Sequence, residues 1–126
     1  MYNNKTFYYK DLSYTILGIA FKVHSKLGSG LPEHNYQKAL MLEFDNNDIP
    51  YTCEERHVVH YNDVQVGHFF TDLIVDNKII LELKSDERIT SSHIAQLFTY
   101  LKASKINVGY ILAFGAQSLK FKRLII

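Results

Sequence analysis

From Asp11 onward, apolar residues recur at spacings of three and four, which is typical of a helix with one buried stripe. The members of that stripe are Ile16, Ile19, Ala20, Val23 and Leu27. Gly28 and Gly30 mark the end of this helix. A second helix is expected from Pro32, because a proline suits the first helical turn, where its missing N–H would be unpaired anyway. Its apolar positions are Tyr36, Ala39, Leu40 and Phe44, and it stops at the polar residues 46–48.

After Pro50 the period of the pattern shortens, which predicts β-strands. We expect strands over residues 51–61 and 64–75, joined by a turn at Asn62 and Asp63, with a bulge at Gly67. Asp76 and Asn77 indicate another turn. The third strand, over residues 78–84, is apolar enough to lie in the middle of a sheet with both faces covered.

The remaining sequence contains one more helix and two more strands. Thr90, Ser91 or Ser92 can cap a helix that ends near Ser104. Its predicted buried stripe is Ile94, Leu97, Phe98 and Leu101. A strand over 108–114, a turn over 115–118 and an edge strand over 119–126 follow. The order α, α, β, β, β, α, β, β predicts an α/β fold in which helices flank one mixed sheet.

The length of 126 residues fits one domain, which we place at residues 11–126 behind a tyrosine-rich N-terminal arm at residues 1–10. Hydrophobic residues at 47% and charged residues at 21% exclude a disordered or low-complexity chain. A single cysteine, Cys53, excludes an internal disulfide or a Cys-rich metal cluster and favours a reducing compartment. Because the sequence contains neither a signal peptide nor an apolar run near the roughly 20 residues that span a bilayer, we expect a cytoplasmic protein without a membrane partner.

The net charge is +1, from 14 basic and 13 acidic residues, so the composition does not indicate a nucleic-acid binder. Any phosphate-binding surface must therefore be local or be assembled by oligomerisation. The aromatic residues of the arm can either stack on bases or seal a homodimer. They are Tyr2, Phe7, Tyr8 and Tyr9.

Three charged residues lie within apolar strand sequences, where they are unfavourable unless paired, solvated or bound to a cation. Asp72 lies in the second strand, and Glu82 and Lys84 lie in the third. Side chains alternate along a strand, so Glu82 and Lys84 share a face. A turn with an odd number of residues places Asp72 opposite Glu82 on that face, whereas a two-residue turn separates them.

With the odd turn, these residues have the geometry of a divalent-metal hydrolytic site. Asp72 and Glu82 hold Mg²⁺, the backbone carbonyl of Leu83 adds a ligand, and Lys84 positions a water or stabilises charge on a phosphate. The alternative is an ordinary cross-strand ion pair or a strand with a wet polar face.

Gln96 and Tyr100 are four residues apart, so they share one face of the last helix, and His93 lies one turn earlier on that face. This face is either a solvated flank of the helix or a wall of the same cleft.

The order of an acid, then Glu-x-Lys, then Gln-x-x-x-Tyr resembles the PD-(D/E)XK nuclease superfamily, and the last motif is similar to that of its RecB-type exonuclease branch. Residues 30–36, GLPEHNY, are similar to the motif of the GxxExxY proteins, small bacterial and archaeal members of that superfamily. The resemblance extends from about Ile16 to Arg123. Thr71 replaces the proline of the superfamily's name, which contributes backbone shape and no ligand.

This resemblance implies a restriction-endonuclease-like αβββαβ core with an extra N-terminal helix. It implies that Asp72 and Glu82 are metal ligands, that Lys84 is the catalytic lysine, and that Gln96 and Tyr100 support the site. Glu33 is similar in position to a helix acid that adds a carboxylate to the metal. Its alternative role is that of a first-turn glutamate favoured by the helix dipole, worth about 0.3 to 1 kcal/mol.

The expected function is therefore Mg²⁺- or Mn²⁺-dependent hydrolysis of phosphodiester bonds in DNA. A catalytically silent module that binds nucleic acid or a protein partner, including a second copy of the chain, is the alternative, and the small size and near-neutral charge favour it. Action on RNA is a third possibility, because a metal-carboxylate site does not itself distinguish ribose from deoxyribose.

Overall fold

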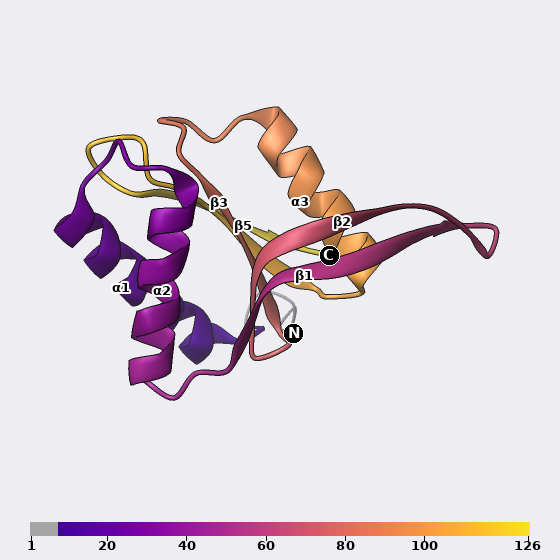
Figure 1. The fold of residues 1–126 in the computed structure, drawn as a ribbon, viewed down its shortest axis with the longest axis horizontal. Coiled ribbons are helices and arrows are strands. Elements are labelled where there is room, and N and C mark those ends of the chain that lie inside the picture. Colours follow the sequence, from indigo (N-terminus) through magenta and orange to yellow (C-terminus); the bar gives the residue numbers. More distant parts are fainter. Residues whose placement is uncertain (1–7) are drawn as a thin grey trace, which may run out of the picture.

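Residues 8–126 are described by the computed structural model (Figure 1), and within them the chain forms three helices and five strands. The elements are α1 (Lys10–Leu27), α2 (Glu33–Asn46), β1 (Tyr51–Tyr61), β2 (Val64–Val75), β3 (Ile79–Lys84), α3 (Ser91–Ser104), β4 (Val108–Ala113) and β5 (Lys120–Ile125). The predicted element order is confirmed, with bounds that agree to within one residue. Residues 1–7 of the expected arm lie outside the described residues, and α1 begins at Lys10, one residue early.

The strands form one sheet in the order β1-β2-β3-β4-β5. Only the β3–β4 pair is parallel, so the sheet is mixed, as expected. Helices α1 and α2 cover one face and α3 covers the other (Figure 1). Among residues 8–126, no helix has both the length and the apolar character needed to cross a bilayer.

Strand β3 lies in the middle of the sheet and contributes to two separate cores. Leu81 and Leu83 pack with α1 and α2, whereas Ile80 packs with α3. Gly109 on β4 lets α3 approach closely, since a Cβ there would lie 2.9 Å from the side chain of Leu97. The alternation places Glu82, between Leu81 and Leu83, on the α3 side of the sheet.

The prediction of a buried side chain is wrong for two residues of the apolar stripes, Leu27 and Phe98. Leu27 is 42% exposed, because the buried face of α1 ends in Val23 and His24, and the His24 imidazole lies 3.0 Å from the carbonyl oxygen of Ala116. Phe98 is 47% exposed, because the buried contacts of α3 are made by Leu97 and Leu101.

The turn between β2 and β3 decides the placement of the acidic residues. Val75 pairs with Ile79, so the turn holds residues 76–78, an odd number. The same register, continued past the Leu73 and Leu81 pair, places Asp72 opposite Glu82. The predicted bulge is displaced by one position: Gly67 still pairs with Val59, and the next pair joins His60 to Gln65, so Val66 is the extra residue.

Strands β1 and β2 extend beyond the rest of the sheet as a two-stranded ribbon (Figure 1). Strand β2 pairs with β3 only at residues 73–75, whereas it pairs with β1 along its whole length. We call the projecting part, residues 55–71, the β-arm. Its base lies at two acidic residues, Glu54 and Asp72.

Candidate active site

Strands β2 and β3 separate at Asp72 and Glu82, and two carboxylates fill the fork between them. The backbone N–H of Asp72 donates to Glu82 Oε2 at 3.0 Å, and the backbone N–H of Leu83 donates to Asp72 Oδ2 at 2.7 Å. Side-chain oxygens thus replace the carbonyl groups that would continue the ladder. The register predicted for the odd turn therefore brings the two acids together.

The fork raises the pKa of both carboxyl groups. Burial is the main cause that raises the pKa of Glu82 to about 8, and the charge of Asp72 adds to it. Burial also raises the pKa of Asp72, helped by the charges of Glu54 and Glu33 and opposed by the Leu83 N–H and by Lys84. Glu82 is only 4% exposed. Both carboxyl groups therefore hold their protons more tightly than exposed acids do, in a site that has more acidic groups than cations.

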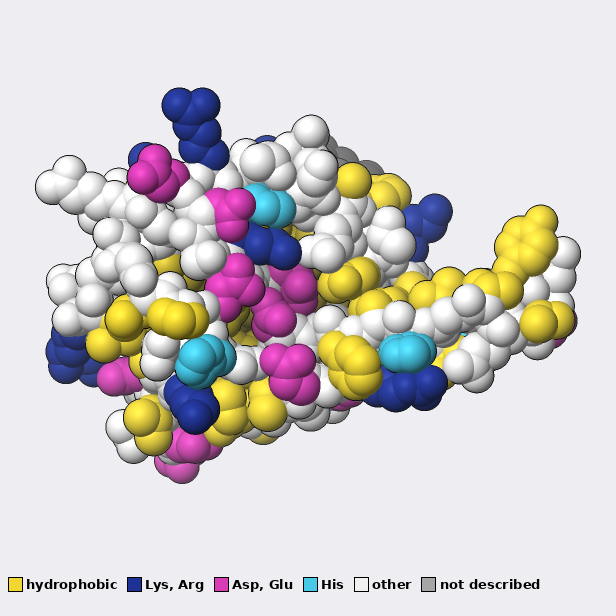
Figure 2. Space-filling model, turned by 45° about the horizontal axis from the view of Figure 1, so that its top comes forward, with side chains coloured by type: hydrophobic (Ala, Val, Ile, Leu, Met, Phe, Trp, Pro, Cys, Tyr) yellow, Lys and Arg dark blue, Asp and Glu magenta, His cyan; other side chains and the backbone are white. Residues whose placement is uncertain are grey.

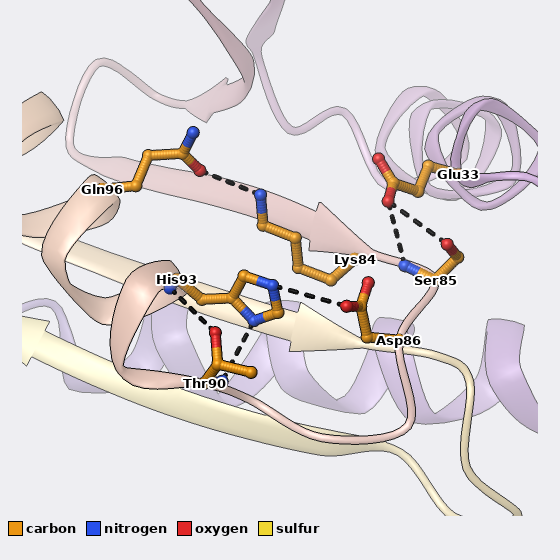
Figure 3. A network of polar contacts seen from close by, with 7 residues as sticks. All are labelled: Glu33, Lys84, Ser85, Asp86, Thr90, His93 and Gln96. Carbon is orange, nitrogen blue, oxygen red and sulfur yellow. Dashed lines mark hydrogen bonds and ion pairs between the residues drawn. The ribbon is translucent and has the colours of Figure 1, made fainter.

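Lys84 is held beside this fork by α3. Its Nζ donates to Gln96 Oε1 at 2.9 Å (Figure 3). Tyr100, one turn further along α3, stacks on Phe69 with ring centroids 4.1 Å apart. Burial raises the pKa of Tyr100, as do the charges of Glu82 and then Asp72, which lie near enough to act on it. Gln96 and Tyr100 thus face the acidic residues from α3.

The start of α3 is fixed by a reciprocal cap. Thr90 Oγ1 accepts from the backbone N–H of His93, and His93 Nδ1 accepts from the backbone N–H of Thr90 (Figure 3). Thr90 is therefore the cap among the three candidates. The other ring nitrogen of His93 lies 3.6 Å from Asp86 Oδ2. These contacts set the position of the turn that precedes Gln96.

Glu33, the first residue of α2, connects that helix to the end of β3. Its Oε2 accepts from the backbone N–H of Ser85 at 3.0 Å and from the Ser85 hydroxyl at 3.4 Å (Figure 3). Tyr36 stabilises the loop that precedes α2, because its hydroxyl donates to the Gly28 carbonyl at 2.6 Å. Gly30 has a φ of 98°, a conformation that favours glycine. Residues 30–36 thus place Glu33 at the edge of the fork.

A cavity of about 170 Å³ contains two polar residues that the sequence patterns did not single out, Gln37 and Glu54. Gln37 Nε2 donates to Glu54 Oε1 at 3.1 Å and to the Asp72 carbonyl at 2.9 Å. Gln37 follows Glu33 by four residues, so helical spacing contained a signal for it. Glu54 had none, because its φ of 51° interrupts the regular strand geometry. The cavity is lined by Glu33, His34, Gln37, Glu54, Asp72 and Leu83.

The loop after β3 is anchored on the turn after β4. The N–H of Phe114 donates to the Lys84 carbonyl at 2.9 Å, and the N–H of Gly115 donates to the Asp86 carbonyl at 3.0 Å. A Cβ at position 115 would lie 2.2 Å from the Ser85 carbonyl oxygen, so the close approach requires glycine. This contact fixes the backbone on which Lys84 and Ser85 stand.

The donor chemistry of the fork fits a hard divalent cation. Carboxylate oxygens are the ligands that Mg²⁺ and Mn²⁺ prefer, and a bound cation would offset the burial and the mutual repulsion that raise the pKa of both acids. Figure 2 shows acidic side chains gathered in a hollow on one face of the molecule. As the side chains of residues 8–126 stand, however, no three His, Cys, Asp or Glu residues are grouped closely enough to hold an ion. Glu33, the expected third acid, is bonded to Ser85 instead.

Comparison with known families gives one match over nearly the whole chain. The sequence profile of the PD-(D/E)XK nuclease superfamily matches residues 10–124. Proteins of that superfamily are in general hydrolytic nucleases, and they typically use divalent metals. A search of curated proteins gives no match.

Comparison with solved structures supports the fold. The crystal structure of SSO0001 is similar with a TM-score of 0.54 and 16% sequence identity, covering 71% of this chain and 47% of that one. The chain thus spans about half the length of the SSO0001 chain. At this identity the likeness concerns the fold alone, and it agrees with the restriction-endonuclease-like α/β architecture predicted from the sequence.

Proposed function

The chain belongs to the PD-(D/E)XK nuclease superfamily, and from that premise we propose that it is a Mg²⁺- or Mn²⁺-dependent nuclease that hydrolyses phosphodiester bonds in DNA. The observation that carries the proposal is the pairing of Asp72 and Glu82 in the fork between β2 and β3. Lys84, bonded to Gln96, supplies the nearby ammonium group.

Each residue of the site has a distinct role in this proposal. Asp72 and Glu82 hold the metal, with Glu33 and the Leu83 carbonyl completing the protein ligands. A bound cation supplies the activation of a water and the neutralisation of phosphate charge.

Lys84 stabilises the negative charge that develops on the phosphate, since its ammonium group is held in a partly buried site. Gln96 fixes the position of that ammonium. Tyr100 supports Gln96 and packs against the base of the β-arm through Phe69. The proposal therefore assigns binding of the cation to the strands and positioning of the lysine to α3.

Cleavage of labelled single-stranded and double-stranded DNA with Mg²⁺ or Mn²⁺ tests the proposal. We expect Glu82→Ala and Lys84→Ala each to lower the rate by about 10²-fold or more, the size typical of removing one group that stabilises a transition state. Glu87→Ala, which removes an exposed acid from the loop after β3, is the matched control and keeps the wild-type rate. Equal cleavage by all four proteins would indicate a contaminating nuclease and contradict the proposal.

A non-catalytic binding module is the second candidate, and the state of the acids favours it: among residues 8–126 no three metal-ligating side chains are grouped to hold an ion. Calorimetric titration with Mg²⁺ and Mn²⁺ separates the two. The nuclease proposal expects binding that Glu82→Ala abolishes. A folded protein that binds neither ion would instead support a module that binds nucleic acid, a protein or a second copy of itself.

An RNA oligonucleotide of the same sequence belongs in the cleavage assay, because the carboxylate fork has no feature that selects deoxyribose. Preferred cleavage of RNA would keep the hydrolytic mechanism and correct the substrate.

A further inference from the structure

The two faces of the β-arm differ in what covers them. On one face, Phe69 stacks on Tyr100 of α3 at 4.1 Å and on His57 at 5.0 Å, and Thr71 is fully buried. On the other face, Phe70 is 46% exposed. One face therefore contacts α3 through the Phe69 ring, and the other is open.

The open face carries an aromatic ring, an imidazole and a guanidinium group. Phe70 pairs with Arg56 across the ribbon, and His68 pairs with Val58, so the four side chains lie on one face. The His68 ring meets the Phe70 ring edge-on at 5.6 Å. Arg56 and His68 are exposed. The ion pairs found among residues 8–126 do not include Arg56. We call Arg56, Val58, His68 and Phe70 the open track.

The open track begins where the acidic residues end. Phe70 is two residues from Asp72 along β2, and Arg56 is two residues from Glu54 along β1, a rise of about 7 Å on each strand. Figure 2 shows apolar, histidine and basic side chains following the acidic group along the projecting ribbon.

The chemistry of the track favours one class of partner. An exposed ring with a cation beside it fits the bases and backbone of an unpaired nucleic-acid strand. In a duplex the faces of the bases are covered by their neighbours, so Phe70 would find nothing on which to stack. Arginine and aromatic residues are also common in protein interfaces, so the position of the track is what favours a nucleic-acid strand over a protein: Phe70 lies two residues from Asp72 of the carboxylate fork.

We propose that the open track binds a single-stranded stretch of nucleic acid, with a base stacked on Phe70 and a phosphate bound to Arg56, and guides that strand to the carboxylate fork. The choice of partner rests on the proposed nuclease function, but binding can be measured without cleavage.

Fluorescence anisotropy of a labelled oligothymidylate of about 15 nucleotides, in EDTA, tests the inference. We expect Phe70→Ala and Phe70→Leu to raise the Kd at least about fivefold, the effect of losing one base stack, and Phe70→Trp to retain binding. Tyr14→Ala is the matched control, because Tyr14 is an aromatic residue on α1 whose side chain is 82% exposed. A duplex of the same length is expected to bind more weakly and to be insensitive to Phe70→Ala.

Arg56→Gln has a different expected effect. Loss of one phosphate contact lowers the slope of log K against log salt by about 0.7, which a mere loss of folded protein does not do. Lys26→Gln, an exposed cation on α1, is the control with an unchanged slope.

Wild-type affinity in both Phe70→Ala and Arg56→Gln would overturn the inference, as would a wild-type protein that binds no single strand. Sedimentation equilibrium tests a second contrary outcome. If the wild type is a dimer, and Phe70→Ala dissociates it without changing oligonucleotide binding, the open track is an interface between two copies of the chain.

These results are separable from failure of the nuclease proposal. Glu82→Ala and Lys84→Ala remove cleavage but are expected to leave the Phe70 effect in EDTA intact. Binding through the track by a protein that cleaves nothing would therefore confirm the inference and contradict the proposed activity.

Discussion

At the scale of the residue, Glu82 is the acid whose ionisation the fold most clearly disfavours. Its carboxyl is almost fully buried, and its pKa is raised to about 8 by burial and by Asp72. Buried carboxyl groups with strongly raised pKa values are concentrated at functional sites, although structural networks also produce them. The protein thus retains an acid in a position where its ionisation is disfavoured in the absence of a cation.

The pKa of Glu82 predicts how stability changes with pH. Between about pH 4.5, where the unfolded chain releases this proton, and about pH 8, where the folded protein does, the folded state binds more protons. The contribution of Glu82 to the free energy of unfolding therefore falls as the pH rises from about 4.5 to about 8. The pKa of Asp72 is shifted in the same direction, so its contribution has the same sign.

Urea unfolding in EDTA at pH 5 and at pH 9 measures this effect. We expect the wild type to lose stability toward pH 9 and Glu82→Gln, which cannot ionise, to lose less. Glu87→Gln removes an exposed acid and should follow the wild-type curve. Curves for wild type and Glu82→Gln that run parallel would show that Glu82 titrates normally.

At the scale of the element, the sequence was sufficient where one local pattern decided the outcome. The period of apolar residues identified all the helices and strands of residues 8–126. The period could not predict the length of the turn at Asp76 and Asn77. That length decides whether Asp72 faces Glu82. Glu54 remained hidden because its left-handed backbone breaks the strand rule. The bond between Glu33 and Ser85 joins residues 52 positions apart, which no local pattern reveals.

The contact between the loop after β3 and the turn after β4 yields a prediction for Gly115→Ala. The added Cβ would meet backbone atoms of Ser85 and Asp86 at 2.2 to 2.6 Å, and backbone cannot move aside as a side chain can. We expect a loss of about 1 to 3 kcal/mol in the free energy of unfolding. Any cleavage activity should fall as well, because this loop carries Ser85 next to Lys84.

Gly18→Ala is the matched control for that substitution. Gly18 lies within α1, and an added Cβ there would meet no heavy atom within 4 Å. Alanine is favoured over glycine in a helix by roughly 0.5 to 1 kcal/mol, so this variant should be more stable than wild type. Denaturant unfolding of both variants decides: equal effects at the two positions would contradict the close approach at Gly115.

At the scale of the whole molecule, a net charge of +1 conceals a separation of charge. Acidic groups gather in the hollow of one face (Figure 2), where Lys84 is the cation that acts on both Asp72 and Glu82. Because the acids of the hollow outnumber Lys84, a bound cation would favour the approach of a phosphate to this part of the surface. Charge totals describe solubility and long-range attraction, and they cannot reveal such a local arrangement.

Three stacked rings, His57, Phe69 and Tyr100, run from the projecting ribbon to the helix that holds Lys84 through Gln96. The β-arm and α3 therefore contact each other through stacked aromatic rings. A nucleic-acid strand bound to the β-arm, as proposed, would therefore contact the part of the molecule that packs on α3, the helix that positions the Lys84 ammonium group. If the β-arm binds a nucleic-acid strand as proposed, a variant such as Phe69→Leu should weaken both the binding of that strand and its cleavage.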